Sequence, residues 1–538
     1  MQNLLKRARW WGRDAPEMPE KGGIVVGYEK IGKHKEKLHI LDGDIHSLIL
    51  GGTGSGKTRR LLLQSIGILG LAGESMIISD PKGEIYEYTA CYLKTLGYKV
   101  SSLNFKNPVK SQSYNFLQPI IDAVNGGDAS KAITLIWDMA ASLVPTGKGE
   151  PIWENGEASI IAGAIMAVVY DNKERPQLQN MTNVYYFISV MGKTDNEGKM
   201  PLEAYVKAKS ENHPAVQLFA VALLAPSRTR GSFFTAALTK LRLFTSPHIY
   251  NMTRKSDFVL EEIGKEKHAI FIILPAGKVT YNSLASLFIF QLYHALEESA
   301  DAIGGRLKIR TNFILEEFGN FTKIPGFVQM ITVARGFGMR FSLVVQSFEQ
   351  LDDIYGREQS KIVRDNCDCL IYLRSASPDT NADISRRLGK YTTSSYGRSN
   401  STAAKHSNTS SASMSLIARD LLTPEEVKML ESPYVLVMLS GHNPAITIMP
   451  DISKWFFNKM YGMGTAEHNT KLRLYRAEQS EQAEQAEILL WLDLSTYASV
   501  AAQPSPTFHF NCDDFPTTDE EADEGSLYDV NLGGLDED

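Results

Sequence analysis

The stretch LILGGTGSGKT at residues 48–58 decides the fold of this 538-residue chain. Three apolar residues typical of a buried strand lead into a glycine-rich turn with the spacing G-x-x-x-x-G-K-S/T, and a helix-like apolar segment follows at 59–69. Such a turn lets backbone N–H groups curve around phosphate oxygens, and the helix start adds the positive end of its dipole. The pattern predicts a P-loop, with a simple Gly-rich turn as the alternative.

Each side chain at the end of this turn has an expected role. Lys57 would pair with the β- and γ-phosphates, and the Thr58 hydroxyl would complete the shell of a magnesium ion. The implied cofactors are therefore ATP and Mg2+. The predicted nucleotide-binding residues are Gly51, Gly52, Thr53, Gly54, Ser55, Gly56, Lys57 and Thr58.

A P-loop enzyme also needs carboxylates at the end of a neighbouring strand. The segment TNFILEEFGN at 311–320 supplies two, with Glu316 predicted in the metal shell beside Thr58 and Glu317 predicted to activate water. The alternative is a solvated helix start carrying two acids, which the helix dipole also favours. Gln346 ends another apolar strand, where its amide could sense the γ-phosphate or instead only bond backbone.

Three further polar residues have open roles. Arg335, in the Gly-containing segment ARGFGMR, is a candidate to reach a nucleotide on a neighbouring subunit, and a plain surface arginine is the alternative. Asp80 and Lys82, in SDPKGE, could lie near the nucleotide. Asp80 could equally be an N-cap before Pro81.

The fold class predicted from the whole chain is α/β. Short apolar runs alternate with helical segments, which is typical of a parallel sheet covered on both faces. The interval 108–260 breaks this alternation and is predicted to be an inserted all-α domain, with helical spacing at 129–142, 153–170 and 214–224. The expected strands are 47–50, 75–79, 98–103, 269–274, 311–315, 341–345, 369–373 and 434–439.

Two segments stand apart in composition. Residues 391–415 contain 13 Ser or Thr and no acid, which predicts a long mobile loop. After residue 461 the chain becomes acidic: a helix is expected at 477–490, and 501–538, with 11 acids and no Lys or Arg, is expected to be disordered.

The net charge of -6 conceals this division and at first argues against a nucleic-acid partner. Residues 462–538 hold three basic and 17 acidic residues and carry -14, which leaves +8 on the first 461 residues.

Four cysteines are too few for a disulfide framework and lack zinc-site spacing. The longest apolar run, 158–170, is too short to cross a bilayer. The N-terminal mixture of Trp10 and Trp11 with basic residues suits a lipid headgroup region, or is a frayed basic start.

At this point the sequence resembles a known family, the type IV coupling proteins, which are TraG-like ATPases of conjugative DNA transfer. The resemblance extends from about residue 40 to 455 and is carried, in order, by GGTGSGKT (51–58), SMIISDPKGEIYEYTACYLKTLGYKV (75–100), FILEEFGNFTKIPGFVQMITVARGFGMRFSLVVQSFEQL (313–351), SRRLGKYT (385–392) and LLTPEEV (421–427). It implies a RecA-like nucleotide-binding domain interrupted by an all-α domain. It also implies that Lys57 and Thr58 are the P-loop pair, Glu316 and Glu317 the second acidic motif, Gln346 the third motif and Arg335 an intersubunit arginine.

The resemblance implies a homo-hexameric ring at the cytoplasmic face of the cell membrane, peripheral to it here. Its expected partners are single-stranded or double-stranded DNA, a relaxase or relaxosome proteins, and components of the type IV secretion channel. Three departures matter: the family usually has Asp where this chain has Glu316, members normally begin with two transmembrane helices, and the acidic tail lies outside the shared core. The resemblance leaves two expectations open: the two helices were removed from this chain, or the chain is a soluble version that docks to a separate small membrane protein.

The expected division of the chain has four parts. These are a basic N-terminal segment (1–39), a RecA-like domain in two pieces (40–107 and 261–461), the all-α domain (108–260) and the acidic tail (462–538). The leading hypothesis for function is an ATP-driven motor that recruits relaxase-bound single-stranded DNA and drives its translocation. The alternative is a substrate-docking and channel-gating platform that does not thread DNA. A small-molecule kinase is disfavoured because no acceptor-substrate site stands between the motifs.

Overall fold

The computed structural model describes residues 5–9, 20–32, 35–144, 151–194, 200–275, 277, 279–403, 407–455, 458, 461, 466–467, 470, 474 and 486–498. Its centre is a nine-stranded sheet in the order β14-β13-β10-β4-β9-β8-β5-β7-β6. The seven strands from β10 to β6 pair in parallel, and β13 and β14 add an antiparallel edge. The strands are β4 (Ser47–Gly51), β5 (Ser75–Ser79), β6 (Lys99–Asn104), β7 (His268–Ile273), β8 (Thr311–Leu315), β9 (Met339–Val345), β10 (Cys369–Arg374), β13 (Tyr434–Leu439) and β14 (Ala445–Ile448).

All eight predicted strands are present, and only the 434–439 strand runs antiparallel to its neighbour. Alternate side chains of one strand enter different hydrophobic clusters: Leu48 and Leu50 lie in one, and Ile49 lies in the other. Both faces of the sheet are therefore covered at its centre, where β4, β5, β7 and β8 are buried at every position. The covering helices are α1 (Leu63–Leu71), α2 (Glu84–Thr95), α12 (Asn282–Asp301), α13 (Phe327–Val333), α14 (Phe348–Tyr355), α15 (Arg357–Asn366), α16 (Pro378–Leu388) and α17 (Pro424–Lys428).

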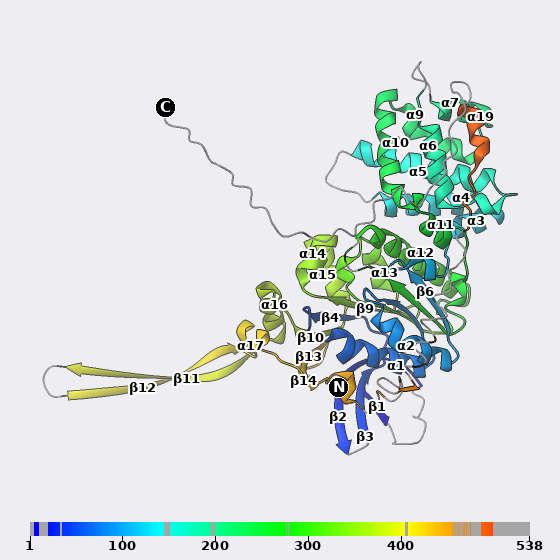
Figure 1. The fold of residues 1–538 in the computed structure, drawn as a ribbon. Coiled ribbons are helices and arrows are strands. Elements are labelled where there is room, and N and C mark those ends of the chain that lie inside the picture. The colour runs from blue at the N-terminus through cyan, green and yellow to red at the C-terminus, as the bar shows by residue number, and fades with distance from the viewer. Residues whose placement is uncertain are drawn as a thin grey trace, which may run out of the picture.

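Between β6 and β7 every regular element of the described chain is a helix, and these helices form a separate layer above the sheet (Figure 1). Its longest helix, α5, is long and apolar enough by length and composition to cross a membrane, but 72% of its most apolar window is buried inside the fold. Its contacts with α4, α6, α8 and α10 make it the core of this layer. The α-helices are α3 (Gln118–Asn125), α4 (Ala129–Leu143), α5 (Pro151–Asp171), α6 (Met181–Met191), α7 (Pro201–Ala208), α8 (Pro214–Leu218), α9 (Ala220–Leu224), α10 (Ser227–Leu241) and α11 (Pro247–Thr253).

A small second sheet precedes the P-loop. β1 (Leu5–Arg9) and β2 (Ile24–Gly32) flank β3 (Lys35–Leu41), with antiparallel pairing on both sides. The apolar side chains of β2 and β3 join the hydrophobic cluster that contains α1; they are Ile24, Val25, Val26, Leu38, Ile40 and Leu41. The N-terminus at 5–9 is thus a paired strand and not a frayed start; Trp10 and Trp11 lie outside the described residues.

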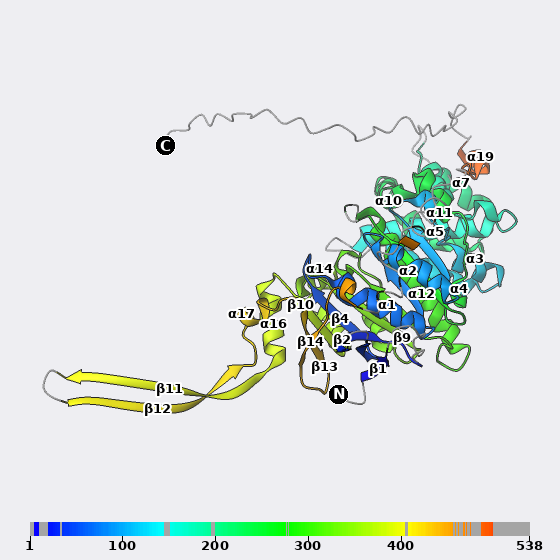
Figure 2. The same cartoon turned by 60° about the horizontal axis from the view of Figure 1, so that its bottom comes forward.

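The predicted mobile loop at 391–415 is wrong. β11 (Lys390–Ala403) and β12 (Ser407–Asp420) form a two-stranded hairpin in continuous antiparallel register. At 14 residues per strand, its length is about 45 Å. The hairpin projects away from the sheet on the side opposite the all-α layer (Figures 1 and 2). Hydroxyl-bearing and small side chains are compatible with paired strands, which composition alone does not reveal.

The acidic region after residue 461 is not uniformly a detached tail. Residues 486–490 are extended, η10 (Leu492–Leu494) and α19 (Ser495–Ala498) follow, and this segment packs on the all-α layer. Trp491 and Leu494 are buried there, and the Trp491 ring stacks on Phe187. The predicted helix at 477–490 is therefore wrong at 486–490, where backbone bonds to the layer replace helical ones; its remainder and 499–538 lie outside the described residues.

Candidate nucleotide site

The P-loop sits at the carboxyl end of β4 and leads into a π-helical turn, η1 (Thr58–Leu62), that continues as α1. Gly54 and Gly56 have φ of 75° and 83°, a region that side chains disfavour. A Cβ on Gly51 would lie 2.5 Å from Ser55 Oγ and 2.6 Å from Lys57 Cγ. The glycines are therefore required by the tightness of this turn.

Lys57 is the buried cation of the site. Its ammonium donates to the Gly51 carbonyl at 2.5 Å and lies 3.3 Å from Glu317 Oε1, with only 6% of the side chain exposed. A cation held inside its own loop and facing a carboxylate is placed to exchange that carboxylate for phosphate oxygens. The fit to a nucleotide phosphate rests on this charge and on the turn of backbone N–H groups around it.

Glu316 occupies the position predicted for the metal shell. Thr58 Oγ1 donates a hydrogen bond directly to Glu316 Oε1, and Ser79 Oγ donates to the Glu316 backbone carbonyl at 2.7 Å. Burial raises the pKa of Glu316 to about 7, and the nearby carboxylates of Asp80 and Glu317 add to the rise. A hydroxyl and a carboxylate are the hard oxygen ligands that Mg2+ takes, so this pair fits the ion that the motif implies.

Glu317 is held in an unusual backbone conformation. Its φ of 53° is the one positive value at a non-glycine residue in the described part of the chain. Such strain persists where surrounding contacts fix it, and here Gln346 Nε2 donates to Glu317 Oε2 at 2.9 Å while Lys57 faces the other oxygen. Gln346 Oε1 in turn lies 3.5 Å from Thr53 Oγ1 of the P-loop. The predicted residues from three separate strand ends therefore form one connected network.

Arg60 is a residue that the sequence reasoning missed. Its buried guanidinium donates to the carbonyl of Ser55 in the P-loop at 2.9 Å, and to Met449 and Tyr434 at 2.8 and 3.0 Å. These bonds tie the P-loop to the β13–β14 edge of the sheet. The signal available in the sequence was weak, since an arginine directly after a P-loop reads as an ordinary helix surface residue.

The remaining candidates lie elsewhere. Arg335 precedes β9 and pairs with Asp368, which precedes β10. Both therefore lie at the amino ends of the parallel strands, whereas the P-loop lies at their carboxyl ends. Within one subunit Arg335 is therefore not brought to the nucleotide site. The Asp80 carboxylate accepts from the backbone N–H groups of Gly83 and Tyr86 at 2.8 Å each and so bonds the start of α2, whose N-cap residue is Gly83 and not Asp80. Asp80 also lies close enough to raise the pKa of Glu316.

Two more placements complete the site. Lys82 is exposed and has no part in the network around Lys57. Arg374, at the carboxyl end of β10, was not predicted; its carbonyl accepts from Gly52 N–H at 2.7 Å and its side chain is exposed beside the P-loop. The logic of strand ends that selected Glu316 and Gln346 would have selected it too.

A strand, P-loop and helix with paired carboxylates at a neighbouring strand end define the class of P-loop nucleoside triphosphatases, here on a RecA-like sheet. The sequence matches the family Type IV secretory system Conjugative DNA transfer over residues 14–485. The chain belongs to this family, that of the type IV coupling proteins.

Relatives and solved structures agree with this placement. The chain is 24% identical over 404 residues to Protein VirD4 of Agrobacterium fabrum, covering 74% of this chain and 57% of that protein. It is 21% identical over 448 residues to the probable conjugal transfer protein TraG of Sinorhizobium fredii, covering 81% and 65% of the two chains. The bacterial conjugative coupling protein TrwBdeltaN70 has the same fold, with a TM-score of 0.57 at 19% identity over 77% of this chain and 86% of that one. TrwB was also solved with ADP and Mg2+, at a TM-score of 0.57, 18% identity and coverages of 77% and 87%.

Proposed function

We propose that this chain hydrolyses ATP with Mg2+ and uses the energy to move DNA into a type IV secretion channel. The observation that carries the proposal is the network in which Lys57, Glu317 and Gln346 meet beside the Thr58–Glu316 pair. A merely nucleotide-binding loop has no need of a strained carboxylate bonded to both a P-loop lysine and a strand-end amide. TrwB, its structural relative, was solved with ADP and Mg2+, which supports the choice of ligands.

Each side chain has a defined task in this proposal. The Lys57 ammonium leaves Glu317 and pairs with phosphate oxygens, while the Thr58 hydroxyl and the Glu316 carboxylate hold the ion. Bound Mg2+ supplies charge neutralisation at the phosphates. Glu317, released from Lys57, accepts a proton from water, and Gln346, still bonded to Glu317, orients that water and reports loss of the phosphate.

The proposed partners follow the family. The chain works as a homo-hexameric ring at the inner face of the cell membrane, meets a relaxase with its DNA, and contacts channel components and a small membrane protein. A ring repeats the charge of the first 461 residues in every subunit, which suits contacts with DNA phosphates that ignore sequence and weaken with salt. The chain spans 57% of the length of the VirD4 relative, so these assignments remain proposals.

The β11–β12 hairpin is the element that we assign to DNA contact. Residues 391–419 contain Arg398, Lys405 and Arg419 but no acid, and the hairpin stands clear of the sheet (Figure 2). Isolated two-stranded hairpins are marginal in water, so a partner surface along its length would stabilise it. Lys390 and Asp420 pair across its base, which lets a short Gly-Ser linker replace 391–419 without touching the nucleotide site.

The test measures ATP turnover with single-stranded DNA, double-stranded DNA, relaxase or nothing added, at two salt concentrations. The motor is supported if DNA stimulates turnover and salt removes the effect, and if the Lys57→Ala variant is inactive. Deleting the hairpin should leave basal turnover unchanged and abolish stimulation by DNA. Stimulation by relaxase alone would support the docking platform instead, and wild-type turnover in Lys57→Ala would overturn both.

A further inference from the structure

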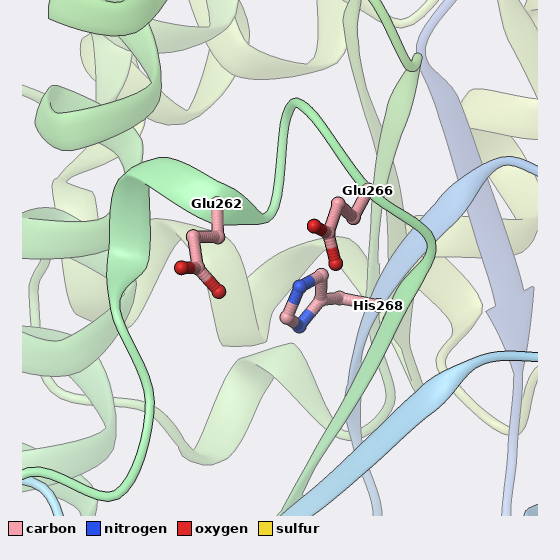
Figure 3. A group of neighbouring side chains, drawn as sticks. All are labelled: Glu262, Glu266 and His268. Atoms are coloured by element: carbon pink, nitrogen blue, oxygen red, sulfur yellow. The ribbon is translucent and has the colours of Figure 1, made fainter.

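A second cluster of charged side chains lies away from the nucleotide site, where the chain returns from the all-α layer into the sheet. Glu262 ends the short helix η5 (Leu260–Glu262), Glu266 follows in the turn, and His268 is the first residue of β7. Their ligand atoms lie within 4.8 Å of one another. In Figure 3 both carboxylates point toward the His268 ring. The three side chains thus converge on one point from the end of η5, the turn after it and the start of β7.

His268 is the unusual member of this cluster. Its side chain is only 2% exposed, and neither ring nitrogen has a hydrogen-bond partner. Buried polar groups are nearly always bonded, so an imidazole with two unsatisfied nitrogens points to a missing partner. A buried imidazole nitrogen with a free lone pair is the atom by which histidine binds a metal ion.

Lys99 shows that this place already attracts a cation. It is the neighbour of His268 across the parallel β6–β7 pair, and its ammonium lies 3.3 Å from Glu262 and 2.7 Å from Glu266. The Lys99 side chain is 55% exposed, so its charge is well solvated and can withdraw into water. The Lys99 ammonium is paired with the two carboxylates, and neither ring nitrogen of His268 is bonded, so Lys99 leaves His268 unsatisfied.

We propose that Glu262, Glu266 and His268 bind a divalent transition-metal ion of the Zn2+ type in place of the Lys99 ammonium. One imidazole with two carboxylates is a ligand set that Zn2+ accepts, with water in the open position, whereas Mg2+ prefers oxygen alone. The ion would fasten the turn at 262–266 to the first residue of β7. It would thereby fix the point at which the inserted helices rejoin the nucleotide-binding sheet.

The experiment uses the full chain, without an affinity tag, freed of metal by EDTA and kept free of nucleotide. Zn2+ affinity is measured by competition with a chromophoric chelator, and Co2+ absorption reports the coordination geometry, which changes in His268→Gln if His268 is a ligand. We expect one tight equivalent in the wild-type chain and binding weaker by about tenfold or more in Glu266→Gln and in His268→Gln. Lys99→Met should bind several-fold more tightly, because it removes a competing positive charge.

The matched control is His294→Gln. His294 lies 2.9 Å from Glu297, and its side chain is 39% exposed, so this pair offers an ordinary surface His–Glu contact. Its loss should leave Zn2+ affinity unchanged. The proposal is overturned if His268→Gln and Glu266→Gln bind Zn2+ as the wild type does, or if Lys99→Met binds it no more tightly. Because Glu266 is exposed, Glu266→Gln folds normally and keeps the test decisive even where His268→Gln does not.

Discussion

The sharpest prediction for the nucleotide site concerns Glu317→Gln. The substitution keeps the size of the side chain and its bond with Gln346, at 2.9 Å, but removes the charge that faces Lys57 at 3.3 Å. It therefore separates two tasks of this residue, since an amide still accepts a hydrogen bond but does not take a proton from water. The left-handed backbone at this position is unchanged, because Gln and Glu have the same backbone preferences.

The magnitude follows from the geometry. Loss of a general base lowers turnover by about 10²- to 10⁴-fold, which corresponds to about 2.7–5.5 kcal/mol in the barrier. Nucleotide affinity should increase, because the phosphate no longer competes with Glu317 for Lys57. In the wild-type chain Lys57 and Glu317 form an ion pair whose side chains are 6% and 20% exposed. An ion pair of about 1 kcal/mol would give a gain of up to about fivefold.

Two measurements check this prediction: steady-state ATP turnover, and binding of a fluorescent ATP analogue in the presence of Mg2+. Glu349→Gln is the matched control, because that carboxylate contacts Ser377 and Thr380 and not the P-loop. It should change neither quantity. Turnover of Glu317→Gln within threefold of the wild type, or a tenfold loss of nucleotide affinity, would refute the role assigned to Glu317.

Three other predictions test the fold around the site. Burial lowers the pKa of His46 to about 3, so below pH 6.5 the folded chain binds fewer protons than the unfolded chain and loses stability as the pH falls. In His46→Asn this part of the pH dependence of the free energy of urea unfolding should vanish. Arg60→Lys leaves P-loop and edge carbonyls unbonded and should cost about 2–4 kcal/mol in urea unfolding. Trp491→Ala should release the C-terminal segment to protease, at a cost of at most about 3–5 kcal/mol, whereas Leu492→Ala, at a residue that is 65% exposed, should not.

The sheet could be predicted from the sequence because its strands are buried on both faces. Runs such as Ser75–Ser79 and Thr311–Leu315 are buried at every position and contain three consecutive apolar residues, and the structure has them with the predicted bounds. The β11–β12 hairpin could not be predicted in this way, since neither of its faces is buried by the rest of the chain. Its pairing puts Tyr396 opposite Met414, both exposed, and no hydrophobic alternation marks such strands.

The site shows the same division between local pattern and long-range packing. Lys57, Glu317 and Gln346 were predicted from separate motifs, and they meet because parallel strands place their carboxyl ends along one edge. Arg60 was not predicted, since its partners at Tyr434 and Met449 lie 374 and 389 residues further on. The left-handed φ of Glu317 is likewise invisible in a sequence that has no glycine there.

The C-terminal segment 486–498 is docked on the all-α layer, so not every residue of the acidic region after 461 belongs to a detached tail. Asn183 donates to the Leu489 carbonyl and accepts from Trp491 N–H, each at about 3 Å, and Arg175 pairs with Asp493, so the chain is held on the all-α layer up to Ala498. The views in Figures 1 and 2 place α19 and the β11–β12 hairpin at opposite ends of the molecule. Beyond a Debye length of about 8 Å the acids of the docked segment, Glu487 and Asp493, exert little repulsion on the DNA contact that we propose for the hairpin. The docked segment and the hairpin that we propose for DNA contact are thus separate surfaces of one chain, and the net charge of -6 averages over both.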